Sequence, residues 1–244
     1  MTCDCLTAFA RPYSRLAPAY DAVVGVRDFL RTRARFEAIV RRHGIRFLSA
    51  VDLGCGTGLF ACWLHRRFGV PVLGVDRSPR MLEMARRNCG CEVRFVQQDI
   101  RRLRLPAPVD LATANTMTLS HLMTGAELRD VFRRIRDALR PAGHLIFDVL
   151  SDRQPWDPAQ ALLVWLGGSP RRMLQSIRWD DDRKVLAMDI LHLEAPDRTV
   201  ERYLGRGYPL RCIGRWLRAS GLPLLACYRS GIAPSCWTVV AQRR

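Results

Sequence analysis

The chain contains no apolar run that approaches the roughly 18 residues of a membrane-spanning helix. Residues 1–16 include an acid and two cysteines but no long apolar core, which is not typical of a signal peptide. We therefore expect a cytoplasmic protein without a membrane partner. With 244 residues, 48% of them apolar, the chain is long enough for one sizeable domain around a hydrophobic core.

Cysteine pairs with the spacing of a zinc site are also missing. The nine cysteines are odd in number and irregularly spaced, and the two C-x-C pairs, Cys3/Cys5 and Cys89/Cys91, lack a C-x₂₋₄-C partner. Without a secretory signal, we expect the thiols to be reduced and to hold no metal. The alternative is a soft metal or metalloid bound by both pairs, which requires the thiols to converge in space.

Lysine is nearly absent: Lys184 is the only lysine among 39 basic residues. With 23 acidic residues the formal net charge is +16, and a basic surface attracts polyanions such as RNA. The arginines, however, are spread along the chain as short pairs on predicted solvated helix faces. We therefore expect a basic enzyme rather than a nucleic-acid-binding protein, with RNA as the alternative partner.

Strands and helices are predicted to alternate up to residue 150. Predicted strands cover residues 48–53, 72–75, 93–96, 111–114 and 145–149, and predicted helices cover residues 26–43, 59–68, 78–88 and 127–139. Ser78 and Pro79 are a typical helix cap and first turn, and Pro141 with Gly143 predicts a helix end. This alternation favours a doubly wound α/β fold with a mostly parallel sheet, whose ligand binds beyond the carboxyl ends of the strands.

The pattern changes after residue 150. Residues 151–170 are rich in Pro, Trp and Gly and predict a loop over the sheet. Predicted extended segments cover residues 172–179, 184–193 and 199–207, and a closing helix and two strands cover residues 211–219, 222–228 and 237–241. The sequence therefore predicts a seven-stranded sheet with a small antiparallel insertion after its fifth strand.

A glycine-rich turn, Asp52–Gly58, stands between a buried strand and a helix. Glycines let the backbone turn tightly and approach a ligand closely. Asp76 ends the next strand, about 20 residues later, where an acid can accept hydrogen bonds from ribose hydroxyls, and Asp99 follows the third strand. The G-x-G-x-G spacing differs from the G-x-G-x-x-G of nicotinamide dehydrogenases.

These segments resemble the motifs of class I S-adenosylmethionine-dependent methyltransferases. The matching segments are Asp52–Gly58 (first motif), Val75–Leu82 (second), Asp99–Ile100 (third) and Leu139–Leu145, which is similar to the L-x-P-G-G-x-L turn with Ala142 in place of one glycine. The resemblance is good over residues 9–150 and loose beyond them. It implies that the cofactor is S-adenosylmethionine and that S-adenosylhomocysteine is the product.

The resemblance also implies which residues contact the cofactor. The implied set is Tyr20, Asp52, Gly54, Cys55, Gly56, Asp76, Arg77, Met81, Asp99, Ile100 and Asn115. Within it, Gly54 to Gly56 pass the methionine part and Asp76 binds the ribose hydroxyls. Met81, Asp99 and Ile100 are placed around the adenine, and Asn115 beneath the cofactor. For Met81 and Ile100 the alternative is core packing.

Methyl transfer from a sulfonium is a direct displacement, so the protein mainly aligns the reactants and excludes water. Two residues are candidates for catalysis. His121 follows the fourth strand, and its pKa range suits a proton acceptor, whereas Tyr13 precedes the first helix and is placed to cover the site. The structural alternatives are a helix cap for His121 and packing for Tyr13.

The region around Tyr13 and Ala19-Tyr20-Asp21 resembles the N-terminal lid of small-molecule N-methyltransferases, such as amino-sugar dimethyltransferases and glycine-type enzymes. The D/N-P-P-Y/F signature of DNA amino-methyltransferases is missing, because Asn115-Thr-Met-Thr118 stands in its place. We therefore expect a small-molecule acceptor with an amine nitrogen. The alternatives are an RNA methyltransferase and an inactive methyltransferase fold that serves as a binding or scaffold protein.

We expect one methyltransferase domain over residues 1–244. Its predicted parts are an N-terminal helical lid (1–45), a cofactor-binding half (46–150), a substrate-side antiparallel insertion (151–210), and a closing helix with the last two strands (211–244). The sequence does not specify the oligomeric state, for which a homodimer is one option.

Overall fold

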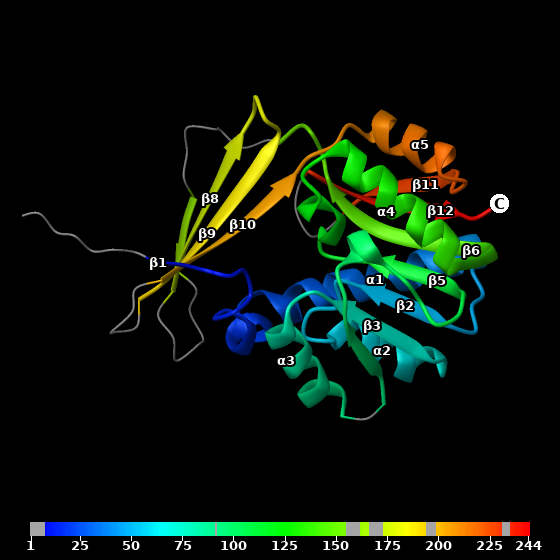
Figure 1. Cartoon of the computed structure of the whole chain (residues 1–244), viewed down its shortest axis with the longest axis horizontal. Helices are drawn as coiled ribbons and strands as arrows, with labels where there is room; N and C mark the ends of the chain where they lie inside the picture. The colour runs from blue at the N-terminus through cyan, green and yellow to red at the C-terminus, as the bar shows by residue number, and fades with distance from the viewer. Residues whose placement is uncertain (1–7, 91, 155–161, 166–172, 194–198, 231–234) are drawn as a thin grey trace, which may run out of the picture.

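The computed structural model in Figure 1 describes residues 8–90, 92–154, 162–165, 173–193, 199–230 and 235–244. Two sheets organise the chain. The larger has seven strands in the order β11-β12-β6-β5-β2-β3-β4, and the smaller has five in the order β1-β10-β9-β8-β7. The smaller sheet projects to one side of the larger one (Figure 1).

The larger sheet is mostly parallel, as predicted. Its strands are β2 (Ala50–Leu53), β3 (Val72–Asp76), β4 (Arg94–Gln97), β5 (Val109–Ala114), β6 (Leu139–Leu150), β11 (Leu224–Arg229) and β12 (Cys236–Gln242). Strands β2 to β6 pair in parallel, while β12 runs antiparallel to both β6 and β11. The doubly wound α/β fold with seven strands is therefore confirmed.

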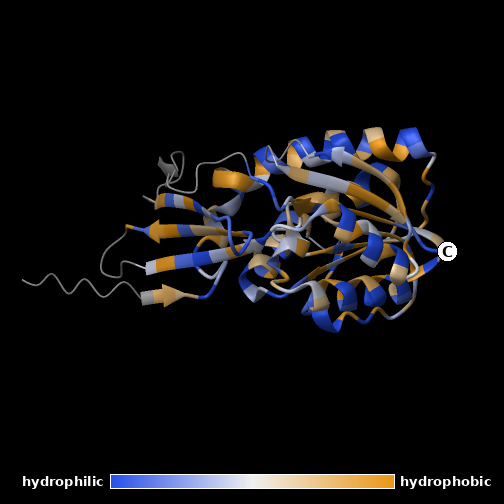
Figure 2. Ribbon diagram, turned by 90° about the horizontal axis from the view of Figure 1, so that it is seen from above, coloured by the Kyte–Doolittle hydropathy of each residue, from blue (hydrophilic) through white to orange (hydrophobic). Residues whose placement is uncertain are grey.

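Helices cover both faces of this sheet. They are α1 (Val26–His43), α2 (Leu59–Phe68), α3 (Pro79–Cys89), α4 (Gly125–Ala138) and α5 (Leu210–Ala219). Residues of α1, α2 and α3 share one buried cluster with the strands, and residues of α4 and α5 share the other. The helices carry alternating hydrophilic and hydrophobic residues (Figure 2), as expected for elements with one face on the core.

Side-chain caps mark the starts of α3 and α4. Ser78 accepts a hydrogen bond from the backbone N–H of Met81, so the predicted cap of α3 is confirmed. Thr124 and Glu127 form a reciprocal capping box, and α4 therefore begins at Gly125, two residues before the predicted start. The helix ends at Ala138, and β6 begins at once, with Ala142 at a φ of 62° inside it.

The smaller sheet contains β1 (Ala8–Ala10), β7 (Leu162–Trp165), β8 (Met173–Asp180), β9 (Val185–His192) and β10 (Thr199–Arg206). The predicted loop over 151–170 is wrong at β7, because Leu162–Trp165 pairs antiparallel with β8. The N-terminal segment is also not purely helical: β1 pairs in parallel with β10. A single 3₁₀ turn, Ala17–Ala19, and a π turn, Asp21–Gly25, then lead into α1.

Cys62 and Cys89 form a disulfide between α2 and α3. The prediction of reduced thiols is therefore wrong for these two residues, because the packing of the two helices brings their Cα atoms to 5.8 Å. Cys89 is thereby removed from its predicted C-x-C pair. Cys3, Cys5 and Cys91 lie outside the described residues.

No group of His, Cys, Asp or Glu in the described ranges is arranged to hold a metal ion. No helix in this part of the chain is long and apolar enough to cross a membrane.

Candidate active site

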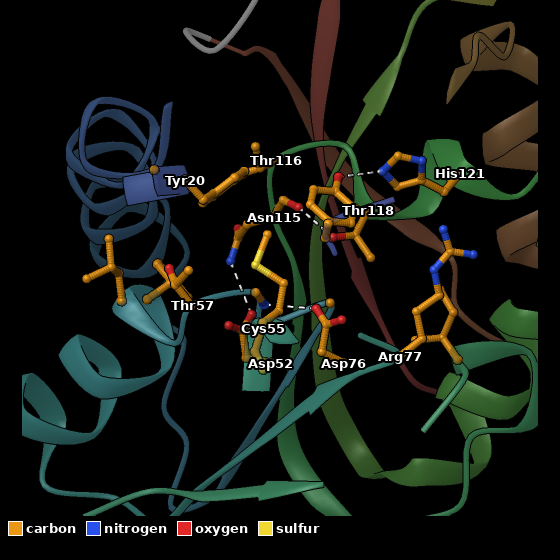
Figure 3. A pocket seen from close by; sticks show the side chains of 18 of the residues that line it. Tyr20, Asp52, Cys55, Thr57, Asp76, Arg77, Asn115, Thr116, Thr118 and His121 are labelled. Atoms are coloured by element: carbon orange, nitrogen blue, oxygen red, sulfur yellow. Dashed lines mark hydrogen bonds between the residues drawn. The ribbon is translucent and has the colours of Figure 1, made fainter. Parts of the chain in front are cut away.

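A cleft of about 1160 Å³, its open mouth included, lies at the carboxyl ends of β2, β3, β4 and β5. The residues that the sequence analysis assigns to the site all line this cleft: Tyr13, Tyr20, Asp52, Gly54, Cys55, Gly56, Asp76, Arg77, Met81, Asp99, Ile100, Asn115 and His121. In Figure 3, Asp52 and Asp76 lie at the floor, and Tyr20 and His121 lie on opposite sides above them.

The glycine-rich turn is held against the end of β3. The backbone N–H groups of Gly54 and Cys55 donate to the carbonyl of Val75 at 2.7 and 3.0 Å. Gly54 has a φ of +66°, and a Cβ there would lie 2.5 Å from the Thr118 side chain. Gly56 has a φ of +54° but no heavy atom within 4 Å of a Cβ, so only its backbone conformation requires glycine.

Asp76 braces this turn from the neighbouring strand. One carboxylate oxygen accepts the backbone N–H of Gly56 at 2.9 Å, and the other accepts that of Ser78 at 2.8 Å. Burial raises the pKa of Asp76, although both hydrogen bonds oppose that rise. Each oxygen keeps a lone pair for a further donor, such as a hydroxyl group in the cleft.

Asp52 lies deeper, at 2% exposure, at the end of β2. Its carboxylate accepts the Thr113 hydroxyl at 2.7 Å and the Asn115 amide at 3.4 Å. Burial raises the pKa of Asp52 to about 7, because these two neutral donors offset only part of the cost of burying a charge.

Tyr13 and His121 meet at one wall of the cleft. The Tyr13 hydroxyl lies 3.3 Å from His121 Nε2, and His121 Nδ1 lies 2.8 Å from the carbonyl of Leu204 in β10. A carbonyl only accepts, so Nδ1 carries the hydrogen and Nε2 accepts from Tyr13. Burial lowers the pKa of His121 and raises that of Tyr13, so both are neutral near pH 7. The ring of His121 contacts a strand rather than a helix end.

Comparison with known proteins gives the family. Residues 50–143 match the family described as a methyltransferase domain. A trans-aconitate 2-methyltransferase from Azoarcus sp. is 39% identical over 202 residues, which are 79% of this chain and 75% of that protein. The chain belongs to the S-adenosylmethionine-dependent methyltransferases.

Other relatives match this methyltransferase over a shorter range. A dTDP-3-amino-3,6-dideoxy-α-D-glucopyranose N,N-dimethyltransferase from Streptomyces fradiae is 32% identical over 130 residues, which are 53% of this chain and 48% of that protein. The chain thus spans about half the length of this and several other curated relatives.

Two solved structures share the fold of this methyltransferase. An S-adenosylmethionine-dependent methyltransferase from Clostridium acetobutylicum has a TM-score of 0.77 at 20% identity, covering 95% of this chain and 98% of that one. A sugar N-methyltransferase from Streptoalloteichus sp. has a TM-score of 0.75 at 21% identity, covering 89% and 88%.

The methyltransferase cleft also contains polar residues of α1 that the sequence analysis missed. Asp28 and Thr32 line the cleft at 6% and 3% exposure, and burial raises the pKa of Asp28. The Thr32 hydroxyl has no hydrogen-bond partner within the described part of the chain. Two polar residues at i and i+4 on the buried face of an amphipathic helix are the signal that could have found them.

Asp99 stands at the mouth of the methyltransferase cleft, clamped by an arginine. Arg101 donates to both of its carboxylate oxygens and also to Glu127, at 3.1 Å. The hydrogen bonds from Arg101 lower the pKa of Asp99, which stays ionised. A donor in the cleft, such as the adenine amine, would share this carboxylate with Arg101.

These residues fit S-adenosylmethionine. The glycine-rich turn leaves backbone space beside the strand ends, and Asp76 offers two carboxylate oxygens for hydroxyl groups. The orphaned Thr32 hydroxyl adds a buried polar atom that a polar ligand would satisfy.

Proposed function

We propose that this protein transfers the methyl group of S-adenosylmethionine to an amine nitrogen of a small-molecule acceptor. The observation that carries the proposal is the meeting of the braced glycine turn, Asp76 and the Tyr13–His121 pair in one cleft. When bound, the cofactor supplies a methyl group already activated on a sulfonium. The protein then has to bind, align and exclude water.

The cofactor-binding role falls to the residues at the strand ends. Asp76 accepts the ribose hydroxyls, and the turn from Gly54 to Gly56 passes the methionine part. Asp99 and the backbone of Ile100 bind the adenine, next to Met81. Tyr20, Arg77 and Asn115 complete the walls, and Asp52 supports Asn115 from below through its hydrogen bond.

The Tyr13–His121 pair is the candidate for proton handling. An ammonium acceptor must lose a proton before its nitrogen carries a free electron pair. Unprotonated Nε2 of His121 can take that proton through the Tyr13 hydroxyl, which passes its own proton on and receives the one from the acceptor. The same two rings also close the wall of the cleft.

Three features support an amine acceptor of small size. The N-terminal segment resembles that of small-molecule N-methyltransferases. One relative is named as an N,N-dimethyltransferase of an amino sugar, and one structure with the same fold is a sugar N-methyltransferase.

Carboxylate methylation is the second candidate. The relative with 39% identity is named for trans-aconitate, a carboxylic acid. Arg77 reaches the cleft mouth and makes no ion pair with any carboxylate of the described residues, so its charge is available to an anionic acceptor. A base test separates the two products: a methyl ester releases methanol in alkali, whereas an N-methyl group stays bound.

Calorimetry with S-adenosylhomocysteine tests cofactor binding. We expect a single site on the wild type and at least about tenfold weaker binding for Asp76→Ala, because charge-assisted hydrogen bonds are lost. Asp110→Ala is the matched control, since Asp110 pairs with Arg140 at the amino end of β5. No heat at millimolar ligand contradicts the proposal and favours an inactive binding protein.

Turnover of amino sugars tests the role of the Tyr13–His121 pair. We expect His121→Ala to lower kcat at least about tenfold while the affinity for S-adenosylhomocysteine changes less than about twofold. His65→Ala is the control, because His65 also holds a backbone carbonyl, that of Val70, at 2.8 Å. An unchanged kcat for His121→Ala removes His121 from the mechanism.

A further inference from the structure

A buried carboxylate in β10 connects the smaller sheet to the residues that cover the cleft. Glu201 is fully buried, at 0% exposure. Five donors point at its two oxygens: the Ser14 hydroxyl (3.1 Å), the backbone N–H groups of Arg15 (2.8 Å) and Leu16 (2.9 Å), His192 Nε2 (3.0 Å) and the Tyr203 hydroxyl (2.9 Å). Three of the five come from a segment about 185 residues earlier in the chain.

We call residues 11–20 the cover segment, because Tyr13 and Tyr20 within it line the cleft. Strand β10 supports both the backbone and the side-chain hydroxyl of Tyr13. The Tyr203 hydroxyl accepts the backbone N–H of Tyr13 at 3.3 Å, and the Leu204 carbonyl holds the His121 ring that accepts the Tyr13 hydroxyl. Tyr13 needs such support, because its φ of 63° is unfavourable for a residue with a side chain.

The charge on Glu201 is what makes these contacts strong. Burial alone raises the pKa of Glu201, but the hydrogen bonds from His192, Arg15 and Tyr203 outweigh burial, and the net pKa is lowered. The carboxylate is therefore ionised near neutral pH. Hydrogen bonds to an ionised acceptor are about twice as strong as neutral ones.

We propose that Glu201 is a positioning residue that latches the cover segment shut over the cleft and thereby orients Tyr13. The inference rests on the proposed function, in which the cleft holds the cofactor. Because β10 belongs to the smaller sheet, closure over the cofactor depends on a strand outside the cofactor-binding half. Opening the cover segment requires the donors of Ser14, Arg15 and Leu16 to leave one carboxylate together.

Glu201→Gln tests the latch by keeping the size of the side chain and removing its charge. Trypsin can cut the cover segment after Arg15. Below the unfolding transition we expect this cut to be at least about tenfold faster in the variant, because cleavage follows the open population. We also expect tritiated S-adenosylhomocysteine to dissociate at least about fivefold faster.

Asp189→Asn is the matched control, because Asp189 pairs with Arg178 and Arg202 in the same sheet. Among the described residues, it forms no hydrogen bond or ion pair with the cover segment. It should change both rates less than about twofold. If Glu201 only stabilised the fold, Glu201→Gln would lower the midpoint of thermal unfolding but would not accelerate the Arg15 cut in the folded protein. Equal cutting and equal dissociation in wild type and folded Glu201→Gln overturn the latch.

Two milder variants keep the test available if Glu201→Gln does not fold. Ser14→Ala and Tyr203→Phe each remove one hydroxyl and no charge, and we expect each to speed the Arg15 cut about threefold. No acceleration in either overturns the proposal. Failure of the proposed function has a different signature: wild type then binds no S-adenosylhomocysteine, while the trypsin comparison without ligand still tests the latch.

Discussion

Two carboxylates at the ends of neighbouring strands differ in their hydrogen-bond donors. Asp76 accepts two backbone N–H groups and borders the cleft, whereas Asp52 accepts a hydroxyl and an amide side chain beneath the turn. Backbone donors at 2.8–2.9 Å support a charge on Asp76. Asp52, with a pKa of about 7, changes its charge within the neutral range.

Asp52 makes the stability of the fold depend on pH. Its pKa is raised on folding, from an ordinary value near 3.8 to about 7. The folded state therefore holds the proton more tightly, and this stabilising contribution is complete at low pH and lost as the pH rises toward 7. The side chain in Asp52→Asn cannot ionise. At pH 8 the free energy of unfolding of this variant should therefore exceed that of wild type by up to about 4 kcal/mol.

Urea unfolding at pH 5 and pH 8 measures this difference. Asp28 and Asp148 also have raised pKa values, but they are present in both proteins and cancel in the comparison. Asp76 contributes to the measured difference, because its charge helps to raise the pKa of Asp52. The gap between variant and wild type should widen from pH 5 to pH 8. A gap that is the same at both values contradicts the raised pKa of Asp52.

At the scale of elements, local sequence signals predicted the cofactor half well. The alternation of apolar runs gave β2, α2, β3 and α3 to within about two residues, and Ser78 marked the start of α3. These features depend on neighbouring residues. The motif residues of the cleft follow from the same local order, because parallel strands end at one edge of the sheet.

Elements formed by distant segments could not be predicted in this way. Strand β1 pairs with β10, and β7 belongs to a sheet whose other strands lie mostly after residue 172. In the sequence, Glu201 resembles any other acidic residue of a predicted strand. Only the fold brings the donors of residues 14–16 and of His192 to its carboxylate. The disulfide likewise needs α2 and α3 to pack first.

The Cys62–Cys89 disulfide predicts a response to reductant. It closes a separation of 27 residues, for which chain entropy gives about 3.5 kcal/mol of stabilisation. In a chain of this size, reduction should lower the midpoint of thermal unfolding by about 10 °C. Cys212→Ala, which removes a free thiol, is the control. Peptide mapping that finds both cysteines alkylated before reduction contradicts the bond.

At the scale of the whole molecule, the two sheets contribute to the cleft in different ways. The larger sheet and its helices form the floor of the cleft, whereas the smaller sheet holds the segment that covers it. The cover segment and strand β10 therefore act on the cleft together, although they are far apart in the chain. Cofactor binding and closure are thus assigned to different parts of the fold.

The net charge of +16 also belongs to this scale, because it is spread over many elements. Several exposed arginines are paired within their own helix, as in Arg87 with Glu83 in α3 and Arg133 with Asp130 in α4. Such pairs neutralise charge locally and leave less of it available to a phosphate backbone. This arrangement favours weak, unspecific attraction of polyanions over a dedicated RNA surface.

The salt dependence of RNA binding separates unspecific attraction from a dedicated RNA surface. We expect a single-stranded oligouridine to bind at about 20 mM salt and to be released by about 200 mM, because counterion release dominates such contacts. S-adenosylhomocysteine affinity should change less than about twofold over the same range, since a small zwitterion displaces few counterions when it binds. No labelled methyl group should enter the RNA. RNA binding that persists at about 200 mM salt, together with methyl transfer to RNA, would replace the small-molecule acceptor with an RNA one.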